Sequence, residues 1–132
     1  MTKATGSFEV LTGGEDPIEE LDGGIKLTHA SGKQAFAGDI EGDGSVDWFM
    51  LYRSDRTAHL VGIQRITGSV GGRRGSFVIA ADGDHDGKAS RIEWVVVSGS
   101  GTGELAGIRG SGQMIAPGGR SGTYELSYEL DP

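Results

Sequence analysis

The sequence GSGTGELAGIRGSG, residues 99–112, places six glycines among small and branched side chains. Glycine is a poor helix former, and within a strand it marks a bulge or the close approach of another backbone or a ligand. This composition excludes a helix. It predicts a bend over residues 99–103 and a strand over residues 104–114, around which the other strands close.

Seven further segments have the pattern of β-strands. In residues 121–130 the side chains of Tyr124, Leu126, Tyr128 and Leu130 alternate with polar ones, which is typical of a strand with one buried face. The other six segments are residues 4–11, 25–37 (with a kink at residues 31–32), 45–52, 58–69, 75–81 and 88–98. Residues 15–24 are acidic and contain a proline, so we expect a mobile loop with at most one helical turn.

These strands predict an all-β fold, a single eight-stranded antiparallel β-barrel occupying residues 1–132 as one domain. Gly71 and Gly72 form a two-residue hairpin signal, because a type I′ turn needs positive φ at both central positions. Residues 45–52 are apolar on both faces. One face would line the lumen, and a loop, a tail or a second subunit would cover the other, which favours a homo-oligomer.

The charge and composition restrict the partners. The net charge of −7 argues against nucleic acid and against anionic membranes as partners, because both attract basic proteins. There is no cysteine, and no apolar run has the length of a signal peptide core or a membrane span. We therefore expect a cytoplasmic protein.

An acidic segment matches a calcium-loop pattern. Asp82, Asp84, Asp86, Gly87 and Glu93 fit D-x-D-x-D-G-x5-E, but strands flank the segment where an EF-hand would have helices. We interpret residues 82–87 as a hairpin turn in which aspartates bind their own backbone, with calcium binding as the alternative.

Other common sites lack their motifs. The three histidines have no metal-ligand spacing, and no serine-hydrolase elbow or phosphate-binding loop occurs. We predict neither a metal site nor a cofactor.

Three strings in this chain resemble a known family. GSGTGELAGIRGSG resembles the glycine motif of allene oxide cyclase and dirigent-type barrels, in which a GTG turn precedes a strand. With the strings GDIEGDGSVDWFMLYR, LVGIQRITGSVGGRRGSFV and WVVVSGSGTGELAGIRGSG, residues 6–128 are similar to the bacterial domain-of-unknown-function family 3224, whose barrel is allene oxide cyclase-like. The resemblance implies the same barrel and frequent self-association. This chain departs from it at Gln64-Arg65, where a Glu-Arg pair is expected, and at Asp47, where a glutamate is expected.

Polar side chains on apolar strands are the candidate lumen residues, because a buried polar group needs a partner or a task. They are Asp47, Tyr52, Gln64, Arg65, Trp94 and Arg109. A purely structural network, such as Asp47 paired with Arg65 or Arg109, is the competing interpretation.

Two functions follow. The first is a barrel that binds an apolar small molecule in its lumen, with cofactor-independent cyclase or isomerase activity on an apolar or polyketide-like substrate as an option. In that case Tyr52, Arg65 or Arg109 would polarise a substrate oxygen. The alternative is a non-catalytic barrel with a filled lumen that acts through protein–protein contacts.

Overall fold

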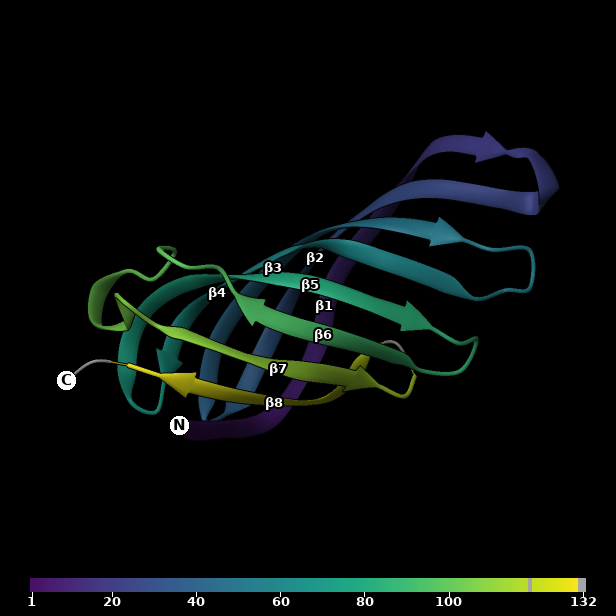
Figure 1. Ribbon diagram of the computed structural model, residues 1–132. Coiled ribbons are helices and arrows are strands. Elements are labelled where there is room, and N and C mark those ends of the chain that lie inside the picture. Colours follow the sequence, from purple (N-terminus) through teal and green to yellow (C-terminus); the bar gives the residue numbers. More distant parts are fainter. Residues whose placement is uncertain (119, 131–132) are drawn as a thin grey trace.

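The computed structural model describes residues 1–118 and 120–130. Eight antiparallel strands form a closed barrel in which each strand pairs with its neighbours in sequence and β1 pairs with β8 (Figure 1). The strands are β1 (Thr2–Leu21), β2 (Ile25–Gly38), β3 (Ile40–Tyr52), β4 (Ala58–Val70), β5 (Arg73–His85), β6 (Ser90–Val96), β7 (Arg109–Ala116) and β8 (Ser121–Glu129). The predicted fold class is confirmed.

The first hairpin is longer than expected. Residues 15–21, predicted as a loop, continue β1 and pair with β2 as far as Leu21 opposite Ile25. Since β8 pairs with residues 2–9 of β1 and Arg120 bonds to Val10, β1 beyond Val10 has one edge without a partner strand among the described residues. A proline is tolerated at such an edge, so Pro17 does not end the strand. A 3₁₀ turn (Asp22–Gly24) closes this hairpin, which projects beyond the barrel (Figure 1).

Two other boundaries were also predicted wrongly. Residues 82–85, expected in a turn, extend β5, and the turn begins at Asp86. Residues 104–108, expected in a strand, contain a 3₁₀ turn (Gly103–Leu105), and β7 starts at Arg109. The pairing of β2 with β3 is unbroken at the predicted kink, residues 31–32, whereas two irregularities lie in β1, at Leu11 and at Ile18.

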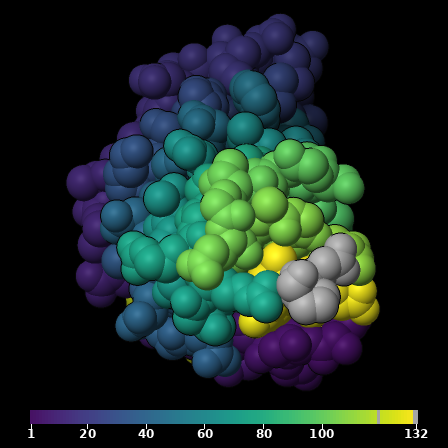
Figure 2. Space-filling view, turned by 90° about the vertical axis from the view of Figure 1, so that its left-hand side faces the viewer, coloured from purple at the N-terminus to yellow at the C-terminus, as the bar shows by residue number. Residues whose placement is uncertain are grey.

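The connection between β6 and β7 closes one end of the barrel. Its side chains Leu105 and Ile108 are fully buried, and Thr102 bonds to Ser76 of β5 through backbone and side chain. Figure 2 looks onto this end, where the connection, in green, lies across the barrel. A side chain at Gly75 would collide with the carbonyl oxygen of Thr102, so this glycine permits the close approach of another backbone.

Aromatic side chains fill the lumen next to the closed end. Trp94 stacks on Tyr124 with ring centroids 6.0 Å apart, and Phe36 meets Tyr124 edge-on at 5.8 Å. The buried face of β8 carries Tyr124, Leu126 and Tyr128, as its alternation predicts.

The outer face of β3 and β4 carries exposed apolar side chains. Phe49 lies opposite Val61 across the two strands, and Ile63 lies two residues further along β4. Phe49 is 55% exposed and Ile63 54%. The homo-oligomer stays a prediction, and this face is where a second copy would pack.

Within the described residues, no helix is long and apolar enough to cross a membrane.

Candidate functional site

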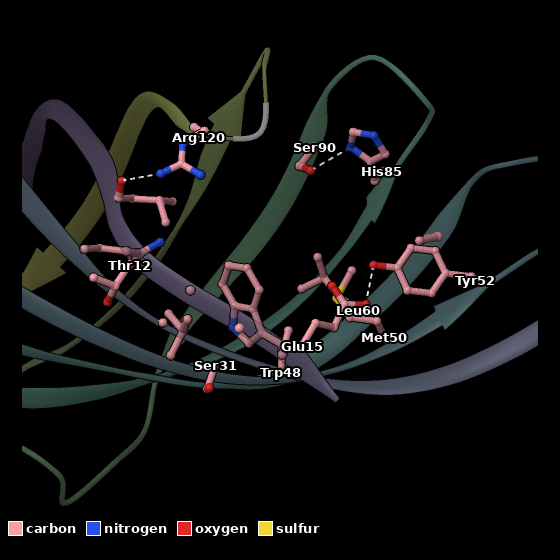
Figure 3. A pocket seen from close by; sticks show the side chains of 18 residues that line it. Thr12, Glu15, Ser31, Trp48, Met50, Tyr52, Leu60, His85, Ser90 and Arg120 are labelled. Carbon is pink, nitrogen blue, oxygen red and sulfur yellow. Dashed lines mark hydrogen bonds between the residues drawn. The ribbon is translucent and has the colours of Figure 1, made fainter. Parts of the chain in front are cut away.

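The lumen is open at the end opposite the β6–β7 connection. A cavity of about 600 Å³ lies there, lined in part by the base of the β1–β2 hairpin (Figure 3). Its apolar wall includes Val46, Trp48, Met50 and Leu60. The other lining residues are Val10, Thr12, Gly13, Gly14, Glu15, Ala30, Ser31, Gly32, Gln34, Tyr52, Ala58, His85, Ser90 and Arg120.

A β-bulge turns an acidic side chain into this pocket. Val10 pairs with Gln34 and Thr12 with Lys33, so Leu11 is an extra residue in β1. An extra residue exchanges the two faces of the strand beyond it. Glu15, opposite Ala30, therefore faces inward.

Glu15 is held by two hydroxyl groups. Its Oε2 accepts a hydrogen bond of 2.6 Å from the Tyr52 hydroxyl and one of 2.7 Å from Oγ1 of Thr28. Burial, together with the hydrogen bond to Glu15 and its charge, raises the pKa of Tyr52 to about 12. At neutral pH Tyr52 is thus a neutral phenol that donates to the Glu15 side chain.

The pocket floor rests on a chain of buried polar side chains. Trp94 Nε1 donates to Oε1 of Gln64 over 3.2 Å. Gln64 Nε2 donates to Oε1 of Gln34 and lies 3.5 Å from the sulfur of Met114. Gln34 is the member of this chain that lines the pocket.

Trp48 contributes an unpaired donor to the pocket wall. Its indole Nε1 is buried and has no hydrogen-bond partner among the described residues. An unsatisfied buried donor is destabilising, so the Trp48 indole N–H lowers the stability of the folded protein.

The rim carries two basic residues. His85 Nδ1 lies 2.9 Å from Oγ of Ser90, and Nη2 of Arg120 donates to the Val10 carbonyl oxygen over 3.5 Å. Figure 3 shows Arg120 and Glu15 on separate parts of the pocket.

The chain resembles known proteins over nearly its whole length. The family model described as "Protein of unknown function (DUF3224)" matches residues 4–128. The chain belongs to the DUF3224 family. A crystal structure of a DUF3224 protein of unknown function from Shewanella oneidensis MR-1 is 30% identical, with a TM-score of 0.80. The match covers 100% of this chain and 98% of that one. No curated protein matches significantly.

In this DUF3224 barrel, three of the predicted lumen residues are in or under the pocket. Tyr52 lines it, whereas Gln64 and Trp94 lie buried beneath its floor.

The lumen placement of Asp47, Arg65 and Arg109 is wrong. All three alternate with the inward residues of their strands and therefore point outward. Asp47 binds His29 at 3.0 Å instead of an arginine, and Arg109 pairs with Glu129 at 3.2 Å. Glu15 and Gln34 were missed. A polar residue in phase with buried Phe36 was the available signal for Gln34, whereas nothing in the local pattern reveals that Glu15 faces inward.

The calcium-like segment of the DUF3224 chain is divided between a strand and a turn. Asp86 accepts hydrogen bonds from the backbone of Lys88 and Ala89, as expected of a turn aspartate. Asp82 and Asp84 lie in β5 and contact His59 at 3.4 and 3.2 Å. Among the residues that the structure describes, no group of three or more histidine, aspartate or glutamate side chains could hold a metal ion.

Proposed function

We propose that the barrel binds a small apolar or amphipathic molecule in its open pocket. The observation that carries the proposal is the cavity of about 600 Å³, which lies within the range of about 300–1,000 Å³ of small-molecule sites. Apolar walls combined with a few placed polar groups are typical of such sites. Trp48, Met50 and Leu60 supply the apolar contact, and Glu15 and Gln34 supply polarity.

The alternative was a filled lumen and a role in protein contacts. Side chains do fill the half of the lumen next to the closed end, where Trp94 and Tyr124 stack. The other half remains open, and this favours a ligand over a purely structural interior.

A cyclase or isomerase activity on an apolar or polyketide-like substrate is the catalytic form of the same proposal, and it agrees with the likeness to allene oxide cyclase-type barrels. In that case the Glu15 carboxylate, held beside Tyr52, is the group placed to exchange a proton with the substrate. The pocket would contribute mainly by holding a flexible substrate in a reactive shape.

A matched pair of glycine variants tests ligand binding. Gly13 shares the inward face with Glu15, and a Cβ there would have the Ser31 carbonyl oxygen as its nearest neighbour at an ordinary 3.5 Å. The backbone of Gly14 also lines the pocket, but a side chain there would point outward by strand alternation, and a Cβ meets nothing within 4 Å. Neither glycine needs positive φ. Gly13→Leu fills the pocket and Gly14→Leu is the control.

The measurement is titration with prodan, a neutral naphthyl ketone whose emission shifts to the blue in apolar sites. We expect saturable binding to the unchanged protein and to Gly14→Leu, and binding at least about tenfold weaker to Gly13→Leu, because a leucine side chain occupies the probe's volume. The proposal is wrong if the unchanged protein does not bind the probe, or if both variants bind it equally.

A further inference from the structure

Trp94 determines how the Gln64 side chain is oriented. An indole nitrogen only donates hydrogen bonds, so the Gln64 atom 3.2 Å from Trp94 Nε1 must be the amide oxygen. The NH₂ group of Gln64 must then point the other way, toward Gln34 and the sulfur of Met114. The Met114 sulfur can only accept a hydrogen bond, which agrees with this orientation of Gln64.

The same reasoning orients Gln34. Because Gln64 presents its NH₂ group, the Gln34 atom that faces it must be the amide oxygen. The NH₂ group of Gln34 is left with no hydrogen-bond partner among the described residues, although the side chain is only 2% exposed and lines the pocket. The series of hydrogen bonds from Trp94 through Gln64 to Gln34 therefore runs in one direction, and it ends at the pocket floor in the free NH₂ group of Gln34.

The surroundings of this donor restrict what it would bind. The indole N–H of Trp48 is also unpaired, but it is buried within the wall, so the donor that a ligand in the cavity can reach is the NH₂ group of Gln34, which requires an acceptor. An ionised carboxylate at the floor would need a cation, because burying a charge beside neutral donors alone is costly. Arg120, the arginine of the lining, is exposed and donates to a backbone carbonyl at the rim.

We infer that the ligand of this pocket carries a neutral carbonyl group, such as a ketone, ester or amide, whose oxygen accepts a hydrogen bond from the Gln34 side-chain amide. The inference rests on the proposed function of the pocket. It adds the class of the ligand and its orientation, with the carbonyl at the floor and the apolar body against Trp48, Met50 and Leu60. Gln34 is then a binding residue, and Gln64 and Trp94 are residues that position it.

Three probes with the same aromatic body test this inference. They are dimethylaminonaphthalene, which has no carbonyl group, prodan, which is a ketone, and dimethylaminonaphthoate, which is a carboxylate. Each is titrated into the unchanged protein and into Gln34→Met, which keeps the length of the side chain but removes the amide. A net hydrogen bond of about 0.5–1.5 kcal/mol corresponds to about a twofold to tenfold difference in affinity.

We expect prodan to bind the unchanged protein about twofold to tenfold more tightly than either other probe. In Gln34→Met the advantage of prodan over dimethylaminonaphthalene should disappear, while the latter still binds. Equal affinities of the unchanged protein for prodan and dimethylaminonaphthalene, or tightest binding of the carboxylate, would overturn the inference while leaving the pocket function intact. The comparison among probes in the unchanged protein holds even if Gln34→Met does not fold. If no probe binds, the proposed function and the inference fall together.

Discussion

Trp48 and Trp94 lie on one inward row of the barrel, separated only by Gly62 and Ala81. Their indole N–H groups differ in hydrogen bonding: that of Trp94 donates to Gln64, whereas that of Trp48 has no partner among the described residues. Gly62 makes room for this arrangement, because a Cβ there would come within 2.8 Å of Cδ1 of Trp48. One tryptophan therefore organises the polar core, and the other forms the pocket wall.

This difference predicts unequal costs for the same substitution. Trp94→Phe should lower the free energy of unfolding by about 2–3 kcal/mol, because it opens a cavity and leaves Gln64 Oε1 without its donor. Trp48→Phe should cost less than about 1 kcal/mol, because it also removes an unsatisfied donor. Urea denaturation of both variants measures the two values. A larger cost for Trp48→Phe would contradict the assigned hydrogen bonds.

The Tyr52–Glu15 contact predicts an alkaline titration. Burial and the Glu15 carboxylate raise the pKa of Tyr52 from 10.0 to about 12. The folded protein thus favours the protonated phenol, so the associated stability is complete below pH 10 and is lost as the pH rises from 10 to about 12. Glu15→Gln should lower the pKa of Tyr52, while burial keeps it above 10. The pH range over which the stability is lost should therefore become narrower.

Ultraviolet absorbance of the tyrosinate measures this change, with Tyr52→Phe identifying the transition that belongs to Tyr52. The pKa of Tyr124 is also raised, mainly by burial, so the assignment needs this variant. An unchanged titration in Glu15→Gln would mean that the two side chains are not in contact in solution.

Tyr124 joins β8 to the turn between β2 and β3. Its hydroxyl accepts from the backbone N–H of Ile40 at 2.8 Å and lies 2.9 Å from the Ala37 carbonyl oxygen. Ile40 is completely buried, so Tyr124→Phe leaves its N–H unsatisfied and should cost about 1–3 kcal/mol of unfolding free energy. Tyr128→Phe is the matched control, because its hydroxyl has no hydrogen bond to a described residue. We expect the control to cost less than about 0.5 kcal/mol in the same denaturation experiment. Equal costs would contradict the structural role of the Tyr124 hydroxyl.

The sequence predicts the barrel well because local chemistry determines its turns and strand alternation. Gly71 and Gly72 have φ of 57° and 87°, as a type I′ turn requires. The pocket is harder to predict, because the face of each strand depends on its register against distant strands. Asp47, Arg65 and Arg109 were assigned to the wrong face for this reason. Glu15 reaches the pocket only through the bulge at Leu11, in a segment whose acidic composition indicates a loop.

The exposed apolar face of β3 and β4 predicts self-association. Phe49 and Val61 form a cross-strand pair, and Ile63 lies next to them on β4. The row of Ile63 continues through Ala80 to Val95. Large side chains about half exposed in one contiguous area are typical of an interface. We expect the unchanged protein to sediment as a dimer or larger oligomer, and Val61→Glu to dissociate it, because a buried carboxylate would lack a partner there. Ser7→Glu, on the exposed outer face of β1, is the control and should leave the mass unchanged. A monomeric mass for the unchanged protein would contradict the prediction, as would an oligomer that Val61→Glu leaves intact, since the contact would then lie on another face.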